Sequence, residues 1–228
     1  MDSAKTLLSE GIEALRQTDA DIKRIIDPRN EEILKLLDRY IKEIELFNPA
    51  YGLVGTEDNK ELVIKHILDS LAPLGIISRL LAEVPSTLCP QIADAGSGAG
   101  LPGIPLAIAL PDCHFTLIER MGRRTGFLWN TKAALGLSNI TVEEGELEKT
   151  TGGRFSLVTF RAFKPLESKL LAALFNACTD NGVIAAYKGR REKIEQEMSF
   201  LSKEQNWEAV PYSVPFLNEE RHILVIRT

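Results

Sequence analysis

The chain has 228 residues, which is long enough to bury a core without disulfide or metal support. Its 44% hydrophobic and 26% charged residues are typical of a globular protein and exclude a wholly disordered chain. The net charge of -5 argues against a nonspecific nucleic-acid coat protein, which would be basic overall. A local basic surface on an acidic body remains compatible with this charge.

The three cysteines, Cys89, Cys113 and Cys178, lie far apart, and no Cys-x-x-Cys or Cys/His cluster accompanies them. We therefore expect reduced thiols, no structural disulfide and no metal site. The first residues lack the apolar segment of a secretory signal, and no apolar run approaches the ~20 residues of a membrane span. These features predict a soluble, cytoplasmic protein without membrane contact.

The first 89 residues show apolar side chains at helical spacing. Pro28 is predicted to separate two helices, with Asn30 as a candidate N-cap. The turn residues 48–52 are predicted to end the second helix. Further helices are expected over 59–71 and 76–83.

From Pro90 onward, short β-rich runs alternate with amphipathic segments. The expected strands are 91–93, 114–118, 140–142, 155–160, 182–187, 212–216 and 222–227, and the expected helices are 104–110, 123–135, 162–178 and 192–204. Such alternation predicts an α/β fold with a mainly parallel sheet. The last two runs are joined by too few residues for a parallel crossover, so they should form an antiparallel hairpin at one sheet edge. We expect one domain over 1–228, with a helical part (1–89) packed on an α/β core (90–228).

The strongest local pattern is Asp94-Ala-Gly96-Ser-Gly98-Ala-Gly100, between the first expected strand of the core and a helix. Ligands of open α/β sheets bind at the carboxyl ends of strands, and glycines there let the backbone approach a ligand closely. Glu119 ends the next strand, about twenty residues further on, where a carboxylate can accept hydrogen bonds from both hydroxyls of a ribose.

The residue types around this loop discriminate between nucleotide cofactors. The third glycine of a dinucleotide-binding loop would fall at position 101, which is Leu101, and no phosphate loop of the GxxxxGK[ST] type is present. Asp94 would repel a pyrophosphate but attract the amine and sulfonium of S-adenosylmethionine. The pattern therefore favours S-adenosylmethionine over NAD. A glycine turn that binds nothing is the remaining alternative.

The stretch from Asp94 to Leu106, DAGSGAGLPGIPL, resembles the bacterial RsmG (GidB) family. The resemblance runs from about residue 47 to residue 189. It includes the segments HILDSL (66–71), Arg123-Arg124, Arg161-Ala162 and Tyr187-Lys188-Gly189. Two positions depart from the family pattern: Glu146 stands where the family usually has Arg, and Ser156 where it usually has Asp.

This resemblance implies a class I, Rossmann-like methyltransferase that uses S-adenosylmethionine to methylate N7 of a guanine in 16S rRNA. The cofactor contacts it implies are Gly96, Gly98, Leu101, Glu119, Leu147, Glu148 and Arg161. The loop pattern itself adds Asp94 and Gly100 to this set.

Methylation at guanine N7 needs no general base, because that nitrogen carries a free lone pair, so positioning and desolvation suffice. In agreement, the fourth core strand is accompanied by neither a Pro-Cys pair nor an Asn/Asp-Pro-Pro-Tyr motif. Arg161, expected at the end of that strand, is the candidate catalytic residue, since a guanidinium there could hold guanine O6, a phosphate or the cofactor. His66 is either a core histidine or a second active-site residue.

Basic residues near the expected strand ends could form a phosphate-binding rim. The candidate substrate-binding residues are Arg123, Arg124, Lys164, Lys188 and Arg190, with Arg120, Arg191 and Lys193 beside them. Because an acidic protein binds naked RNA weakly, the expected partner is 16S rRNA within the small ribosomal subunit. Two alternatives stay open: a methyltransferase of a small molecule, and a non-catalytic regulatory protein that binds S-adenosylmethionine.

Overall fold

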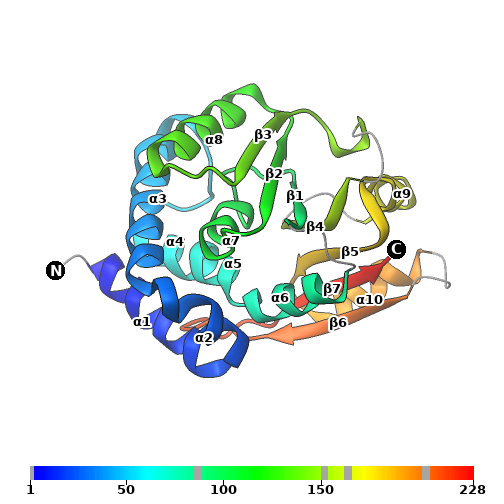
Figure 1. Cartoon of the computed structure of the whole chain (residues 1–228), viewed down its shortest axis with the longest axis horizontal. Helices are drawn as coiled ribbons and strands as arrows, with labels where there is room; N and C mark the ends of the chain where they lie inside the picture. The colour runs from blue at the N-terminus through cyan, green and yellow to red at the C-terminus, as the bar shows by residue number, and fades with distance from the viewer. Residues whose placement is uncertain (1–2, 85–88, 150–153, 162–165, 202–205) are drawn as a thin grey trace.

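The computed structural model describes residues 3–84, 89–149, 154–161, 166–201 and 206–228 (Figure 1). In this part of the chain, seven strands form one sheet in the order β3-β2-β1-β4-β5-β7-β6. The strands are β1 (Gln91–Ala95), β2 (His114–Glu119), β3 (Ile140–Glu144), β4 (Phe155–Arg161), β5 (Cys178–Lys188), β6 (Trp207–Tyr212) and β7 (Arg221–Arg227). Strands β1 to β5 pair in parallel, and β7 pairs antiparallel with both β5 and β6. The predicted α/β class and the antiparallel edge hairpin are confirmed.

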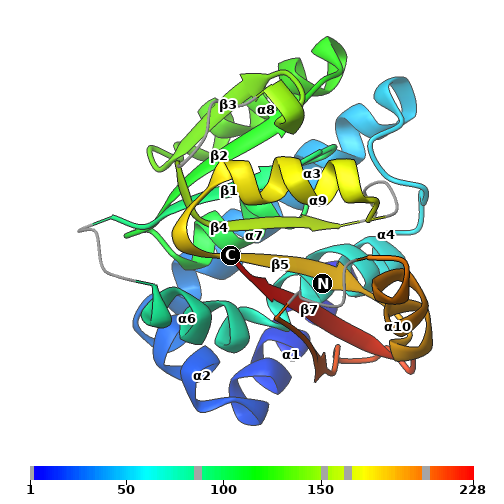
Figure 2. The ribbon, with the colours of Figure 1, turned by 90° about the vertical axis from the view of Figure 1, so that its right-hand side faces the viewer.

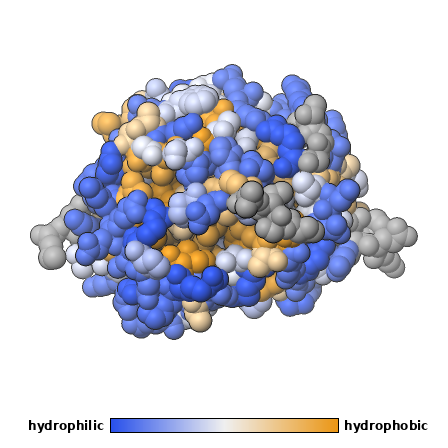
Figure 3. Space-filling model, in the orientation of Figure 1, coloured by the Kyte–Doolittle hydropathy of each residue, from blue (hydrophilic) through white to orange (hydrophobic). Residues whose placement is uncertain are grey.

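Helices cover both faces of the sheet (Figure 2). The α-helices are α1 (Ser3–Thr18), α2 (Ala20–Ile26), α3 (Asn30–Tyr51), α4 (Asn59–Leu62), α5 (Asp69–Leu71), α6 (Leu74–Glu83), α7 (Gly103–Ala109), α8 (Gly122–Leu135), α9 (Ser168–Ala177) and α10 (Arg191–Ser199). Short 3₁₀ turns are η1 (Asp27–Arg29) and η3 (Leu147–Lys149), and η2 (Val63–Leu68) is a π-helical segment between α4 and α5. The face of the molecule in Figure 3 is mostly hydrophilic, with apolar residues visible toward its middle.

Alternate residues of the central strands belong to two separate hydrophobic clusters, as the pleat of a strand requires. Ile92 of β1 packs with helices α1 to α8, whereas its neighbour Ala93 packs with α9 and α10. The first cluster joins the N-terminal helices to the sheet, and Tyr40 of α3 donates a hydrogen bond of 2.8 Å to the carbonyl of Ala99. This shared core supports the single domain that we propose for the whole chain.

One predicted boundary in the helical part was wrong. Asn30 is already the first residue of α3 and not its N-cap, and its side-chain oxygen has no hydrogen-bond partner. The other end is confirmed, because the helix continues through Pro49 to Tyr51 and ends within the predicted turn residues at Gly52, whose φ of 59° is left-handed. Asn48 stabilises this end because its side-chain oxygen accepts the backbone N–H groups of Leu53 and Val54.

The sixth strand was also misplaced, because β6 covers Trp207–Tyr212 and only its last residue lies in the predicted run 212–216. Pro215 has no N–H to donate to a sheet, and Phe216 has a φ of 66°, so this stretch turns instead of extending. Helix α9 likewise spans a shorter segment than the predicted 162–178, since Cys178 already begins β5. Residues 162–165 lie outside the described part of the chain.

Candidate functional site

The glycine loop leaves β1 at the edge where the carboxyl ends of the parallel strands meet. Gly96, Gly98 and Gly100 have φ values of 69°, 58° and 90°, which side chains rarely tolerate. At Gly100 a Cβ atom would stand 2.4 Å from a side-chain carbon of Ile104 as well. The loop is tied to β2 because the N–H of Gly96 donates to the carbonyl of Ile118 at 2.8 Å.

Glu119 is the last residue of β2, and its carboxylate is anchored from two sides. One oxygen accepts the N–H of Gly98 and the other accepts the N–H of Met121, each at 2.9 Å. Each carboxylate oxygen has lone pairs for a further donor. The carboxylate is thus fixed beside the glycine loop as a rigid pair of acceptors, which suits two adjacent hydroxyl groups.

A cavity of about 230 Å³ opens beside this carboxylate. Its lining comes from the ends of three neighbouring strands and comprises Gly96, Ile118, Glu119, Arg120, Met121, Arg124, Gly145, Glu146, Leu147 and Glu148. The structure thus brings together four of the predicted cofactor residues: Gly96, Glu119, Leu147 and Glu148. It also adds Glu146, one of the departures from the family pattern, whose carboxylate lies 3.4 Å from the ammonium of Lys149.

The other five predicted cofactor residues do not line this cavity; they are Asp94, Gly98, Gly100, Leu101 and Arg161. Asp94 is completely buried, where one carboxylate oxygen accepts the N–H of Gly103 at 3.0 Å and the other, Oδ1, has no hydrogen-bond partner. Burial raises the pKa of Asp94 to about 6, although the hydrogen bond from Gly103 opposes this shift. Gly100 and Leu101 are buried in the loop. The N–H of Gly98 donates to Glu119, which does line the cavity. Cofactor contacts of these residues therefore stay predictions.

The donors and acceptors of the cavity fit S-adenosylmethionine. The carboxylates that line the cavity, those of Glu119, Glu146 and Glu148, match hydroxyl and cationic groups of a ligand and would repel a pyrophosphate. One buried polar atom of a lining residue, the donor Arg124 Nε, lacks a hydrogen-bond partner. Buried polar atoms normally have hydrogen-bond partners, so this donor is consistent with a polar ligand that would accept from it.

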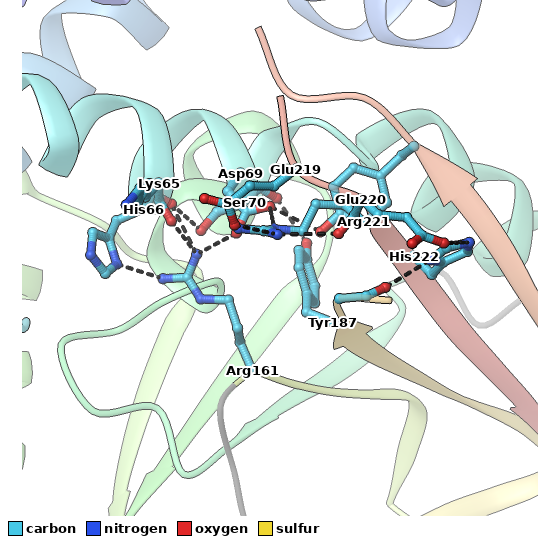
Figure 4. Close-up of polar contacts among 12 residues, drawn as sticks. Lys65, His66, Asp69, Ser70, Arg161, Tyr187, Glu219, Glu220, Arg221 and His222 are labelled. Atoms are coloured by element: carbon cyan, nitrogen blue, oxygen red, sulfur yellow. Dashed lines mark hydrogen bonds and ion pairs between the residues drawn. The ribbon is translucent and has the colours of Figure 1, made fainter. Parts of the chain in front are cut away.

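Arg161, the last residue of β4, points toward the segment of α4, η2 and α5 (Figure 4). Its Nη1 donates to the carbonyl oxygens of Lys65 and His66 and to Asp69 Oδ2, each at 3.3 Å, and its Nη2 donates to His66 Nδ1 at 3.2 Å. Only 14% of the Arg161 side chain is exposed. The guanidinium is therefore a fixed group and not a mobile surface cation.

Asp69 connects this group to the far end of the sheet. Its Oδ1 accepts the hydroxyl of Tyr212 at 3.0 Å and lies 3.5 Å from Nε of Arg221. Burial, and next the charge of Arg161, lower the pKa of His66 to about 4, so its imidazole is neutral at pH 7. His66 and Arg161 were each predicted as candidate site residues, but their contact was not predicted. The pattern that could have indicated this contact is the spacing of His66 and Asp69, three residues apart in one helical segment, together with Arg161 at the end of a strand.

The predicted basic rim separates into two groups. At the start of α8, Arg123 and Arg124 each lie 3.4 Å from a backbone carbonyl, of Ala50 and Gly52 respectively. Arg124, predicted to contact substrate, also lines the cavity described above. This group therefore lies next to the candidate cofactor site.

The second group lies at the end of β5. Lys188 is ion-paired with both carboxylate oxygens of Glu197, at 2.7 and 2.8 Å, so its charge is compensated. Arg190 is exposed and lines a second hollow together with Lys193 and Arg221. Lys164 lies outside the described residues. RNA contacts of all these residues stay predictions.

Within the described ranges, no three His, Cys, Asp or Glu side chains gather in a way that could hold a metal ion. Among the same residues, no helix combines the length and the apolar character that crossing a membrane requires.

Comparison with solved structures supports the fold. A SAM-dependent methyltransferase from Aquifex aeolicus aligns with a TM-score of 0.53 at 14% identity, over 75% of this chain and 94% of that one. The tRNA (m1A58) methyltransferase TrmI from Aquifex aeolicus gives 0.53 at 11% identity, over 69% and 68% of the two chains. These similarities confirm the predicted class I methyltransferase architecture.

Sequence comparison is more specific. The family model for rRNA small subunit methyltransferase G (GidB) matches residues 33–224. Relatives named ribosomal RNA small subunit methyltransferase G include those of Treponema denticola, 38% identical over 98% of this chain and 96% of the relative, and of Treponema pallidum strain Nichols, 39% identical over 99% and 95%. The protein of Nitrosococcus oceani is 37% identical over 85% of this chain and 86% of its own. The chain therefore belongs to the rRNA small subunit methyltransferase G family, whose members are S-adenosylmethionine-dependent methyltransferases of ribosomal RNA.

Proposed function

We propose that this protein transfers the methyl group of S-adenosylmethionine to N7 of a guanine in 16S rRNA, and that its substrate is the small ribosomal subunit. The observation that carries the proposal is the Glu119 carboxylate, which the Gly98 and Met121 amides hold at a strand-end cavity. The membership in a family of rRNA methyltransferases supports the substrate class.

Different residues around the cavity would contact different parts of the cofactor. Glu119 would accept hydrogen bonds from the ribose hydroxyls, Leu147 would pack against the adenine, and Arg124 Nε would donate to a ring nitrogen. Asp94, beneath the loop, favours the cationic amino-acid end through its charge. When bound, S-adenosylmethionine supplies an electrophilic methyl group on a sulfonium.

The residues near Arg161 suit a reaction that removes no proton before attack. His66 is neutral because its pKa is about 4, and it already accepts a hydrogen bond from Arg161. Arg161 is permanently charged and can only donate. These side chains therefore orient groups and exclude water, which is what attack by the free lone pair of guanine N7 requires.

The net negative charge of the protein favours an assembled particle over naked RNA as substrate. The net charge is -5, and Lys188, one of the predicted RNA contacts, is neutralised by Glu197. Phosphate contacts of cations provide most of the nonspecific affinity for RNA, so we expect weak binding to protein-free rRNA.

Methyl transfer from tritiated S-adenosylmethionine tests the proposal. The substrates are small subunits from cells that lack this protein and, in parallel, the 16S rRNA extracted from them. We expect one labelled guanine, methylated at N7, in the subunit and little label in the free RNA. Equal labelling of free rRNA would refute the subunit as substrate, and label on another atom would refute N7. A folded protein that fails to bind S-adenosylmethionine would refute the enzyme assignment.

A further inference from the structure

The segment that holds Arg161 departs from α-helical geometry at the point of contact. In an α-helix the N–H of Asp69 would bond the carbonyl of Lys65, but here it bonds the carbonyls of Ile64 and His66. The Lys65 carbonyl, which Asp69 leaves unused in the π-helical turn η2, accepts a hydrogen bond from Arg161 Nη1. Such π-turns inside helices are frequent at functional sites.

His66 is held in one tautomer by the same contact. A guanidinium has no acceptor, so His66 Nδ1 must be the acceptor of the bond from Arg161 Nη2, and the ring proton resides on Nε2. Figure 4 shows the imidazole on one side of the guanidinium and Asp69 on the other. The two side chains thus fix the plane of the guanidinium from both sides.

This arrangement uses one end of the guanidinium and leaves another edge open. Nη1 has three acceptors on the helix, and Nη2 has His66. For the Nε–H and the second Nη2–H of Arg161, the structure shows no partner among the described residues. These two groups form a planar pair of donors of the kind that binds oxygen acceptors on bases.

The register of the sheet places the backbone of Arg161 near the glycine loop. Thr159 of β4 pairs with Asp94 of β1, and Arg161 follows two residues later, at the level at which β1 enters the loop. β1 and β4 flank the point where the strand order reverses, which is where ligands of such sheets bind.

We infer that His66 and Asp69 are positioning residues, which orient Arg161 so that its open Nε–Nη2 edge binds O6 of the target guanine. The inference rests on the proposed function, because it assumes a guanine substrate. Arg161 would contact O6 and not N7, since a hydrogen bond to N7 would occupy the lone pair that attacks the methyl group.

Two substitutions of His66 distinguish the roles of its two ring nitrogens, Nδ1 and Nε2. In His66→Asn the amide oxygen replaces the Nδ1 acceptor, whereas His66→Gln places its amide near Nε2 and removes the Nδ1 acceptor. We expect His66→Asn to keep kcat within a few fold and His66→Gln to lower it about 10- to 100-fold, as misplacement of a positioning group does. Affinity for S-adenosylmethionine should not change. His114→Gln is the matched control, because His114 contacts Thr141 at the opposite end of the sheet.

A double-mutant cycle distinguishes positioning from mere structural support. In an Arg161→Ala background, His66→Gln and Asp69→Asn should cause no further loss of kcat, because the group they orient is gone. Independent, multiplicative losses in that background would overturn the inference. Equal kcat of wild type and His66→Gln, with the wild type active, would overturn it as well.

A spectroscopic measurement tests the orientation without any activity. ¹⁵N NMR of labelled histidine should show His66 as a neutral ring with its proton on Nε2 down to about pH 5, because its pKa is about 4. In Arg161→Ala the pKa should rise toward its ordinary value. A His66 that titrates near 6.5 in the wild type would refute the positioning contact between His66 and Arg161, whereas an inactive wild type with the predicted spectrum would refute only the proposed function.

Discussion

The two sides of the strand-end edge differ in how completely their buried polar groups are satisfied. On the cofactor side, Asp94 Oδ1 and Arg124 Nε have no hydrogen-bond partner. On the other side, both oxygens of Asp69 have partners, and both Nη atoms of Arg161 donate hydrogen bonds. The first side therefore keeps polar groups without a protein partner, whereas the groups of the second are held in place by their protein contacts. Ligand binding should stabilise the first side more.

The largest effect is expected where the cofactor side depends on a single carboxylate. Glu119→Gln keeps one acceptor oxygen but turns an NH₂ group toward a backbone N–H. The substitution therefore weakens both the hydrogen bonds from the backbone and those expected from the ribose hydroxyls. We expect affinity for S-adenosylmethionine, measured by calorimetry, to fall about 100-fold, since hydrogen bonds to charged groups contribute about 1.5–3 kcal/mol each.

Glu144→Gln is the matched control for this substitution. Glu144 pairs with Glu119 in the register of β2 and β3 but does not line the cavity. Its affinity for the cofactor should remain at the wild-type value. An unchanged affinity of Glu119→Gln would place the ribose elsewhere and remove the contrast between the two sides.

The cofactor side should also carry a cost in stability that depends on pH. The pKa of Asp94 is raised from 3.8 to about 6, so the folded state binds the proton more tightly than the unfolded state. The protein therefore loses stability as the pH rises from 3.8 through 6, and the full cost is present above that range.

Asp94→Asn removes this charge while it retains an acceptor for the N–H of Gly103. We expect the variant to be more stable than wild type by up to ~3 kcal/mol at pH 8 and about equally stable below pH 4, in urea titrations. It should bind S-adenosylmethionine more weakly, because the charge that favours the cofactor's cationic end is lost. Asp112→Asn, at an exposed position, should change neither property. A stability difference that does not depend on pH would contradict the assigned role of the Asp94 charge.

The same contrast explains what the sequence could reveal. The glycine loop and Glu119 were predictable because a short spacing along the chain fixes their relation in any strand-loop-helix-strand unit. The contact of His66 with Arg161 spans 95 residues and depends on how the helical part docks on the sheet, which no local pattern encodes. Likewise, the position of β6 depended on pairing with β7, and apolar residues at 212–216 were misleading because Pro215 and Phe216 form a turn.

The smallest effect is expected at the end of β5, where a paired and an unpaired cation stand side by side. Lys188 is bound by Glu197, whereas Arg190 is exposed and has no ion-pair partner among the described residues. If Arg190 meets an RNA phosphate, Arg190→Ala should reduce the slope of log affinity for small subunits against log salt by about 1. Lys188→Met should leave that slope unchanged, because its ammonium is already neutralised and releases no counterions on binding. The reverse result would mean that RNA displaces Glu197 from Lys188, so that this end of the sheet, like the cofactor side, is completed only by its ligand.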